Sequence, residues 1–420
     1  MTCPSSRALN NYLIVADDFT GSNDTGVQIR RRGIPVRVVF TGVGVTGAES
    51  CVLDTESRAL SEEDAFQRVA SETKEIPFEN FFRVIKKVDS TLRGNIGAET
   101  RALSQCYKPD LIVFAPAFPD LGRTTINRIH CLNGTPVSET ELARDPKTPV
   151  KNDDIQKIMA EAFTDEEVIH IGLEALRSSA ALRSGNFDLE MGRIFCFDAA
   201  LNSDLQNIVR TVLATGKRVL WVGTAALADN LLSVEKSVPP ALAVVASLSS
   251  VTRGQVHFAE KQGVCLVKVP LYAILEKKTG PGEIAKQAIA LLKEGKDVIL
   301  LSSSTYSEEE HQKAEKSARS VGLSTEEMSA FTQKLMGQIA LLVLEGTGVS
   351  GLFLSGGDTA MICFESVQSL GSSIVTEIAV GIPLMRLIGG KYEGLKVVTK
   401  AGAFGKEDAI FYALRKLREV

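Results

Sequence analysis

Residues 12–26 read YLIVADDFTGSNDTG, an apolar run followed at once by carboxylates, hydroxyls and glycines. The run at 12–16 is typical of a buried strand, and the polar residues after it precede an expected helix. In open α/β sheets, ligands bind at the carboxyl ends of the strands. We therefore interpret Asp17, Asp18 and Asp24 as a functional group of carboxylates, with helix capping as the simpler role of one or two of them.

A distant segment repeats the pattern of a strand followed by a polar turn. Residues 83–95, RVIKKVDSTLRGN, contain Lys87, Asp89 and Arg93. These three suit a small polyhydroxy acid, because arginine geometry favours carboxylates and aspartate favours hydroxyls. Arg58, which ends a third strand, is a further candidate. The alternative is a helix that starts at or next to Asp89 and leaves Arg93 solvated.

Three loops in the second half of the chain suit a phosphate. They are residues 246–252 (ASLSSVT), 355–359 (SGGDT) and 401–405 (AGAFG), and each follows an expected strand. Glycine lets a backbone approach an anion, and the N–H groups at a helix start attract it. Capping of a helix by Asp358 or Thr359 is the alternative for the second loop. Together the loops indicate a nucleotide pocket.

Strand-like runs alternate with amphipathic helical stretches along the whole chain. This pattern predicts an α/β protein made of two open, mostly parallel α/β domains with an interdomain cleft. The Pro-Pro pair in residues 233–240 cannot continue a helix or a central strand, so we read this segment as a linker between domains at 1–232 and 241–420. Strands are expected at 12–16, 36–40, 51–53, 83–88, 111–115, 168–171, 194–197, 218–222, 243–246, 266–269, 298–302, 352–354 and 396–399.

Composition excludes several classes of function. The net charge is -4 over 420 residues, which opposes nucleic acid or an anionic membrane as the main partner. No apolar run approaches the roughly 18 residues of a membrane helix, and no signal peptide is visible. The seven cysteines are scattered and form no C-x-x-C pair, so neither a disulfide framework nor a zinc site is indicated. We expect a cytoplasmic protein.

Residues 42–47, GVGVTG, match the dinucleotide fingerprint G-x-G-x-x-G. The fingerprint should open a helix, yet a strand is expected at 51–53, so we interpret the glycines as a loop. An NAD-dependent oxidoreductase is therefore the alternative from another functional class. The four histidines are expected to be structural, and no Ser-His-Asp or metal-ligand spacing appears.

Taken together, these motifs resemble the four-carbon acid sugar kinase family over nearly the whole chain and in the family's order. One position departs from the family, because Ala246 stands where a glycine is common. The segments that carry the resemblance are ADDFTG (16–21) with Asp24, DTESR (54–58), KVDSTLRG (87–94), APA (115–117) with GRT (122–124), GGDT (356–359) and GAFG (402–405).

The resemblance implies an N-terminal acid-sugar-binding domain and a C-terminal nucleotide-binding domain. It implies ATP-dependent phosphorylation, with Mg²⁺, of the terminal 4-hydroxyl of a four-carbon sugar acid. D-threonate is favoured, with D-erythronate and 3-oxotetronate as alternatives. The metal ligands are not predicted, and a homodimer is left open.

Two sets of site residues follow. Asp17 is the expected base, with Asp89 as the second candidate. The substrate-binding residues expected are Asp17, Arg58, Lys87, Asp89, Ser90, Thr91 and Arg93. The nucleotide-binding residues expected are Ser247, Ser249, Gly356, Gly357, Asp358, Thr359, Gly402 and Gly405.

Overall fold

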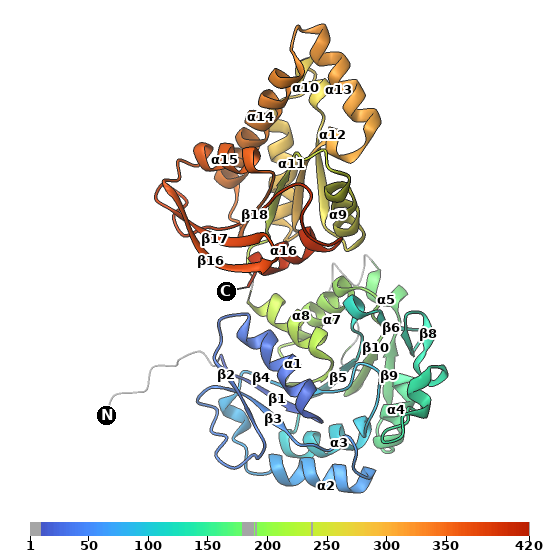
Figure 1. Cartoon of the computed structure of the whole chain (residues 1–420). Helices are drawn as coiled ribbons and strands as arrows, with labels where there is room; N and C mark the ends of the chain where they lie inside the picture. Colours follow the sequence, from blue (N-terminus) through green and yellow to red (C-terminus); the bar gives the residue numbers. More distant parts are fainter. Residues whose placement is uncertain (1–9, 179–188, 190, 237, 420) are drawn as a thin grey trace, which may run out of the picture. The chain divides into compact units, whose positions relative to one another are not determined.

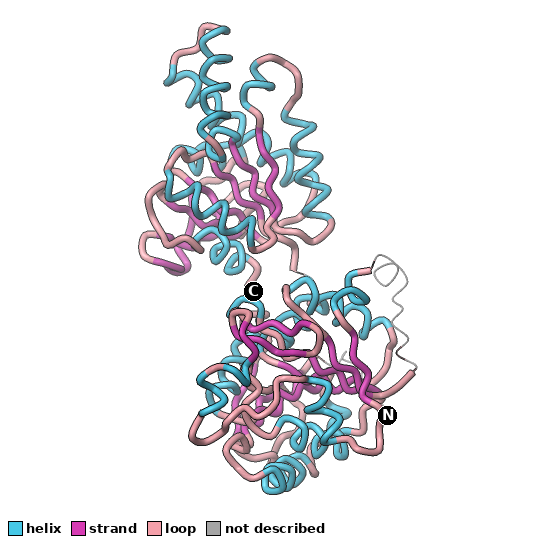
Figure 2. Tube along the Cα trace, turned by 90° about the vertical axis from the view of Figure 1, so that its right-hand side faces the viewer, coloured by secondary structure: helices cyan, strands magenta, loops and turns pink. Residues whose placement is uncertain are grey.

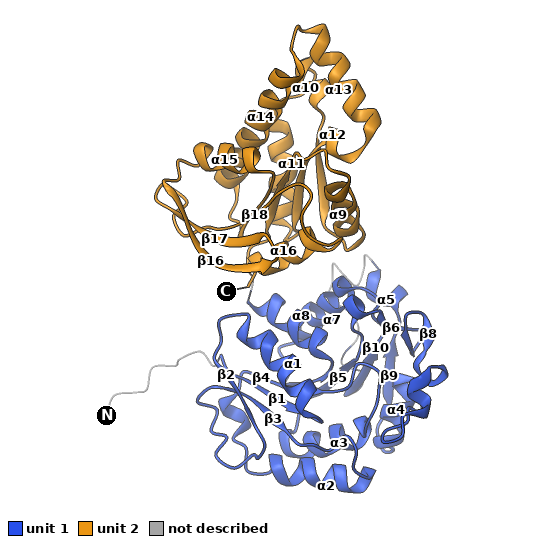
Figure 3. Ribbon diagram, viewed as in Figure 1, with its two compact units in different colours: residues 1–237 blue, residues 238–420 orange. Residues whose placement is uncertain are grey.

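The computed structural model describes residues 10–178, 189, 191–236 and 238–419 (Figure 1). The chain divides into two compact units, residues 1–237 and 238–420 (Figure 3). Both are α/β units, as the sequence predicts. The cleft expected between the two halves stays a prediction.

Unit 1 is built on an eight-stranded sheet in which every strand pair is parallel. The strand order is β2-β3-β1-β4-β11-β5-β10-β9. Its strands are β1 (Tyr12–Ala16), β2 (Val36–Val39), β3 (Ser50–Asp54), β4 (Arg83–Lys87), β5 (Leu111–Ala115), β9 (Val168–Ile171), β10 (Ile194–Phe197) and β11 (Val219–Gly223). A small antiparallel sheet contains β6 (Arg123–Ile126), β7 (Ile129–Leu132) and β8 (Thr135–Pro136).

Helices cover both faces of the large sheet in unit 1 (Figure 2). They are α1 (Phe19–Arg30), α2 (Glu62–Thr73), α3 (Ile96–Tyr107), α4 (Ile155–Ala162), α5 (Leu173–Arg177), α7 (Asn202–Ala214) and α8 (Ala225–Glu235). Alternate residues of β1 enter different cores: Leu13 packs with residues of α2, α3 and α4, and Ile14 with residues of α1, α7 and α8. Burial on both faces explains why the run is continuously apolar.

Unit 2 has a seven-stranded sheet of order β13-β14-β12-β15-β18-β17-β16. The first five strands are parallel, and β17 and β16 continue the sheet antiparallel. Its strands are β12 (Leu242–Val245), β13 (Cys265–Val269), β14 (Val298–Ser302), β15 (Gly351–Ser355), β16 (Gly371–Ala379), β17 (Ile382–Ile388) and β18 (Lys396–Lys400). Its helices are α9 (Ser250–Lys261), α10 (Leu271–Leu275), α11 (Pro281–Lys293), α12 (Ser303–Tyr306), α13 (Glu308–Ser320), α14 (Thr325–Gly346), α15 (Gly357–Ser366) and α16 (Ala409–Leu417).

Every expected strand exists, with small shifts at its ends, but the hairpins were not predicted. The strands β16 and β17 differ from the core strands because much of β16 is exposed and lacks a continuous apolar run. The β6 strand, RTTI, is similarly polar. Neither pattern stands out beside the fully buried strands β1, β3, β5, β11, β14 and β15.

The predicted linker is wrong at its start. Residues 233–235 belong to α8, where Val234 packs against the core and Glu235 accepts hydrogen bonds from Arg83 and Tyr12. These tertiary contacts extend the helix almost to the Pro-Pro pair. The glycines at 42–47, in contrast, lie in a loop before β3, as expected.

None of the helices in the described residues is long and apolar enough to span a membrane. The six cysteines that lie within the described residues are free thiols.

Candidate active site

The first candidate site lies where three neighbouring strands of unit 1 end. β3, β1 and β4 are adjacent and parallel, with Ala16 in register with Asp54 and Val15 with Lys86. Polar segments far apart in sequence therefore meet at one edge of the sheet. The structure brings Asp17, Arg58 and Asp89 together there.

Arg58 is shared among three aspartates. Its Nε donates to Asp17 Oδ2 at 2.7 Å, and its Nη2 donates to Asp17 Oδ1 at 2.9 Å and to Asp18 Oδ1 at 2.7 Å. Nη1 lies 3.5 Å from Asp89 Oδ1. Burial by itself lowers the pKa of Arg58, but the hydrogen bond and charge of Asp17 outweigh it and raise the pKa. Arg58 is thus a permanent cation, and a substrate carboxylate would have to share it with these aspartates.

Asp89 is held by its own turn. It accepts hydrogen bonds from Arg93 Nε (3.0 Å) and Nη2 (2.9 Å), from the Thr91 N–H (3.0 Å) and from the Thr91 hydroxyl. Burial raises the pKa of Asp89, but the Arg93 hydrogen bonds and the Arg58 charge prevail and hold it well below its usual range. Asp89 is therefore a carboxylate at neutral pH and a weak base.

The turn also decides between the two interpretations of this segment. The helix does not start near Asp89, because α3 begins at Ile96 with Asn95 as its N-cap. Arg93 is paired rather than solvated. Leu92 and Gly94 have φ angles of 63° and 93°, in the left-handed region. The hydrogen bonds to Asp89 stabilise this turn instead of a helix.

Lys87 lies beside the start of α1. Its buried Nζ donates to the Val88 carbonyl at 2.9 Å, and burial lowers its pKa against the charges of Asp17 and Asp89. A Cβ at Gly21 would lie 2.8 Å from Lys87 Nζ and 2.6 Å from Asp18 Oδ1. Only glycine fits there, which explains the glycine in this motif.

Helix capping accounts for Asp18 but not for Asp17. The Asp18 side chain accepts a hydrogen bond from the Gly21 N–H at 2.9 Å, as the N-cap of α1. Asp24 is exposed on the same helix. Asp17 is buried and bound to Arg58, so the capping alternative holds for one carboxylate of the group.

A layer of supporting residues behind this cluster was not predicted. Lys86 and Glu99 form a fully buried ion pair at 2.7 Å, and Ser57 donates to Glu99 at 2.8 Å. Ser57 precedes Arg58, so this network fixes the Arg58 loop. A lysine in an apolar strand was the available signal, because a buried lysine needs a partner.

His130 supports the second turn. Its Nε2 lies 3.0 Å from the Ser90 carbonyl and its Nδ1 lies 2.9 Å from Thr125 Oγ1. Burial lowers the pKa of His130 to about 4, so the ring is neutral at physiological pH. The expectation of a structural histidine agrees with these contacts.

A hollow of about 620 Å³ opens beside this cluster. Arg58, Gly94 and Asn95 line one side of it, and Lys147 and Lys151 line another. The lining supplies cations and amide groups, and it also carries the carboxylates of Glu62 and Glu161.

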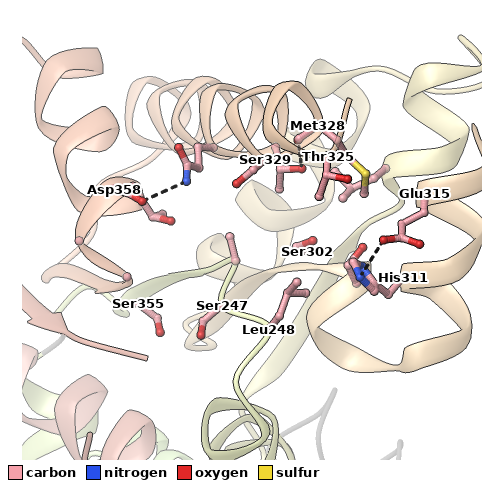
Figure 4. A pocket seen from close by; sticks show the side chains of 18 residues that line it. Ser247, Leu248, Ser302, His311, Glu315, Thr325, Met328, Ser329, Ser355 and Asp358 are labelled. Carbon is pink, nitrogen blue, oxygen red and sulfur yellow. Dashed lines mark hydrogen bonds and ion pairs between the residues drawn. The ribbon is translucent and has the colours of Figure 1, made fainter. Parts of the chain in front are cut away.

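The second candidate site is a hollow of about 410 Å³ in unit 2 (Figure 4). It lies at the carboxyl ends of β14, β12 and β15, which are adjacent in the sheet. Figure 4 shows Ser355 and Asp358 at one end, His311 and Glu315 at the other, and α14 running between them. Of the expected nucleotide-binding residues, those that line it are Ser247, Gly356, Gly357, Asp358 and Thr359.

Three expected residues, Ser249, Gly402 and Gly405, are not on this lining. Ser249 is the N-cap residue of α9. A Cβ at Gly402 would lie 2.8 Å from Ser247 Oγ, so glycine permits the two loops to touch. Gly405 has a φ of 84° and turns the chain toward α16.

Gly356 starts α15 without a side-chain cap. Its φ of 105° lies in the region that favours glycine. Among the described residues no side chain caps the helix, so the capping alternative for Asp358 or Thr359 is wrong. The first N–H groups of α15 consequently lack a side-chain acceptor. Ala246, which departs from the family pattern, is not among the residues with positive φ, so alanine fits its position.

Unpaired hydroxyls distinguish this hollow. Ser302, Ser304 and Ser355 are buried, line it, and have an Oγ without a hydrogen-bond partner among the residues that the structure describes. Buried polar groups are rarely left unsatisfied, so these hydroxyls point to a polar ligand. Ser302 and Ser304 were missed, although Ser302 ends an expected strand, Ser304 follows it, and the strand-end argument applies to both.

Comparison with known proteins gives the family. A family model described as a sugar-binding N-terminal domain matches residues 12–231, and one described as a nucleotide-binding C-terminal domain matches residues 242–410. The chain is 33% identical to a D-threonate kinase of Salmonella typhimurium, covering 97% of this chain and 98% of the relative. It is 30% identical to a D-erythronate kinase of Heliobacterium modesticaldum, with the same coverage of both chains.

A solved structure agrees in fold. A domain of unknown function from Bordetella bronchiseptica, crystallised with bound citrate as a domain-swapped dimer, is 28% identical and matches with a TM-score of 0.62. The match covers 98% of this chain and 99% of that one. From these matches over nearly its whole length, the chain belongs to the four-carbon acid sugar kinase family.

Proposed function

We propose that this protein transfers the γ-phosphoryl group of ATP to the terminal 4-hydroxyl of a four-carbon sugar acid, with D-threonate as the preferred substrate. The observation that carries the proposal is the cluster of Asp17, Arg58 and Asp89 at the strand ends of a unit that matches a sugar-binding domain. The D-threonate kinase relative at 33% identity supports the choice of substrate.

In this proposal unit 1 binds the acid. Lys87, Arg58 and Arg93 would face its carboxylate, and the hydroxyls of the substrate would meet Asp17 and Asp89, with Ser90 and Thr91 beside them. The charges of the three aspartates and three cations are balanced within the cluster, so an entering carboxylate competes with Asp18 for Arg58. The citrate in the solved relative, itself a hydroxy acid, supports this kind of ligand.

Asp17 is the proposed base. As the substrate oxygen forms its bond to the γ-phosphorus, the bond from that phosphorus to the bridging oxygen of ADP breaks, and the hydroxyl proton passes to the Asp17 carboxylate. Both Asp17 oxygens accept hydrogen bonds from Arg58, and a loose phosphoryl-transfer transition state makes little demand on the proton acceptor. Asp89 is the weaker candidate, because the hydrogen bonds from Arg93 and Thr91 and the charge of Arg58 hold its pKa well below the usual range.

In unit 2, ATP is the proposed ligand of the hollow, with its phosphates toward the Gly356 turn and Ser247. Among the described residues no group of three or more acidic, cysteine or histidine side chains could hold a metal ion. Mg²⁺ usually keeps its waters and binds through substrate phosphates and one or two carboxylates. Asp358, on the lining of the hollow, is the carboxylate that fits, and the ion would neutralise phosphate charge.

A substrate panel tests the proposal. We expect release of ADP from ATP and Mg²⁺ with D-threonate at a higher kcat/KM than with D-erythronate or 3-oxotetronate. A coupled assay for ADP measures this, and absorbance at the NADH band with the same acids tests the oxidoreductase alternative. No ADP from any four-carbon acid would reject the kinase assignment for this chain.

A homodimer is proposed on the strength of the solved relative, which is a domain-swapped dimer. Light scattering of the purified protein tests it. The cytoplasm stays the compartment expected from the sequence.

A further inference from the structure

Lys400 is a buried lysine at the carboxyl end of β18. Its side chain is 2% exposed. Nζ donates to the carbonyls of Gly402 (3.0 Å) and Ala401 (3.1 Å) and lies 3.3 Å from Thr252 Oγ1. All of these partners are neutral, and no carboxylate in the described part of unit 2 forms an ion pair with it.

A buried cation without a counter-ion is unusual, because the low-dielectric interior penalises the charged form. Burial accordingly lowers the pKa of Lys400 to about 8. An apolar residue of similar length at position 400 would avoid this penalty. The position of this charge therefore suggests an anion that arrives from outside the chain.

Lys400 is connected to the Ser247 and Gly356 turns, which are two of the three loops that suit a phosphate. Thr252 Oγ1, which Nζ contacts, lies 3.4 Å from Ser247 Oγ and donates to the Gly402 carbonyl at 2.8 Å. The Lys400 carbonyl accepts a hydrogen bond from the Gly356 N–H at 2.9 Å. Ser247 and Gly356 both line the hollow, so Lys400 stands one residue behind its surface on two sides.

We propose that Lys400 is a positioning residue for the nucleotide phosphates, with its ammonium charge held behind the Ser247 and Gly356 turns. The inference rests on the proposed nucleotide site of unit 2. The Lys400 ammonium supports the Ser247 loop through Thr252 and supplies the positive charge that the phosphates face, while the Lys400 backbone carbonyl holds the Gly356 turn beside it. Bound phosphates in turn supply the counter-ion that the free protein lacks.

A pH dependence follows. The groups that Nζ contacts are Thr252 from α9 and the two carbonyls after β18, and its register partner on β15 is the uncharged Ser355. None of these carries a charge, so the phosphates would be the nearest anions. Their binding raises the pKa of Lys400 and takes up a proton. Affinity should therefore be constant below pH 8 and fall above it, where the free protein loses this proton.

Titration calorimetry with MgADP between pH 7 and pH 9 tests the proposal on the whole protein. For the wild type we expect Kd to rise above pH 8 by up to about tenfold per pH unit, one proton being linked to binding. At pH 8, heats measured in buffers of different ionisation enthalpy should reveal proton uptake. Lys400→Met should raise Kd at pH 7 roughly tenfold or more, the size of a lost charged hydrogen bond, and remove both pH effects.

Two further variants isolate the charge. Lys400→Arg keeps a cation that does not titrate, so its Kd should stay flat to pH 9. Lys396→Met removes a lysine from the other end of the same strand and should leave the wild-type pH profile unchanged. His311, Glu315 and Asp358 line the same hollow and are present in both the wild type and Lys400→Met. Any pH dependence that they cause should therefore appear in both proteins and cancel in the comparison.

The outcomes separate the two proposals. A wild-type Kd that is flat from pH 7 to pH 9, without proton uptake, overturns the role of Lys400 even if Lys400→Met does not fold. A full pH effect in Lys400→Met overturns it as well. Absence of MgADP binding at every pH rejects the nucleotide site itself, and with it the inference.

Discussion

The two candidate sites differ in whether their buried polar groups are already paired within the protein. In unit 1, Asp17, Asp89, Arg58 and Arg93 bind one another, so each charge has a partner before any substrate arrives. In unit 2, buried hydroxyls and the ammonium of Lys400 have no charged partner. The first site is organised by internal ion pairs, and the second is completed by its ligand. Mutations should consequently affect shape and chemistry in unit 1 and affinity in unit 2.

The largest expected effect comes from Asp17→Asn, which keeps the size of the side chain but removes its basicity. If Asp17 accepts the proton, kcat should fall by roughly 10²–10⁴-fold, with the lower end favoured by a loose transition state. The Kd of the sugar acid should change much less, because the amide still binds a hydroxyl. Steady-state kinetics and calorimetry measure the two effects separately.

Asp89→Asn is the matched comparison. If it abolishes kcat while Asp17→Asn leaves kcat intact, the base has been assigned to the wrong strand end. If both variants keep full kcat, these carboxylates are structural, and the interpretation of the 12–26 segment fails.

Arg58→Ala tests whether the ion pairs of unit 1 organise the site. It should weaken binding of the sugar acid by about 1.5–3 kcal/mol, the usual contribution of a charged hydrogen bond. It should also lower the free energy of unfolding by about 3 kcal/mol, because Asp17 is left as an unpaired buried charge. Calorimetry and urea denaturation measure these quantities.

Arg37→Ala provides the control, since Arg37 forms an exposed ion pair with Glu49 in the same unit at 3.2 Å. Exposed pairs contribute about 0–1 kcal/mol, so this variant should unfold almost like the wild type. Equal destabilisation in both variants would contradict the special role of Arg58.

Gly357→Val tests the hollow of unit 2. A Cβ at Gly357 would have no atom within 4 Å, so the side chain enters open space and folding should be preserved. That space borders the hollow, and we expect the KM for ATP to rise on the order of tenfold, or about 1.4 kcal/mol. The affinity of the free enzyme for the sugar acid should not change.

Gly348→Val is the control for this variant, because Gly348 is also open on all sides and lies outside the hollow. It should leave KM for ATP unchanged. Unaltered ATP binding in a folded Gly357→Val protein would mean that the nucleotide does not use this turn.

The smallest expected effect concerns Asp54, whose buried Oδ2 has no partner. Burial raises the pKa of Asp54 to about 6, above the ordinary value of roughly 3.9. A raised folded-state pKa stabilises the protein at low pH, and that stability is lost as the pH rises through 6. Asp54→Asn cannot ionise at this position and does not lose this stability. Its free energy of unfolding should therefore rise relative to that of the wild type when the pH is raised from 4.5 to 7.5.

Urea denaturation at the two pH values measures this gain. Asp165→Asn, on an exposed turn, should show no such change. The assignment would be contradicted if the wild type became more stable relative to Asp54→Asn when the pH is raised from 4.5 to 7.5.

The sequence by itself determined the α/β class, the strand ends and the motifs at 16–21, 54–58, 87–94 and 356–359. These are local properties, because a continuous apolar run must be buried and a parallel strand must end where its polar turn begins. The same locality explains why β16 was missed, since most of its residues are exposed and form no continuous apolar run.

Only the tertiary structure decided which groups are paired. Asp17 and Arg58 are 41 positions apart, Lys86 and Glu99 belong to different elements, and Lys400 meets Thr252 across 148 positions. Whether a charge is satisfied depends on which strands are neighbours and on how deeply the group is buried. Sheet order brings β3, β1 and β4 together, and among the described residues Ser302, Ser355 and Lys400 are buried without a charged partner. Neither sheet order nor burial is encoded within one segment, so neither could be predicted from local sequence.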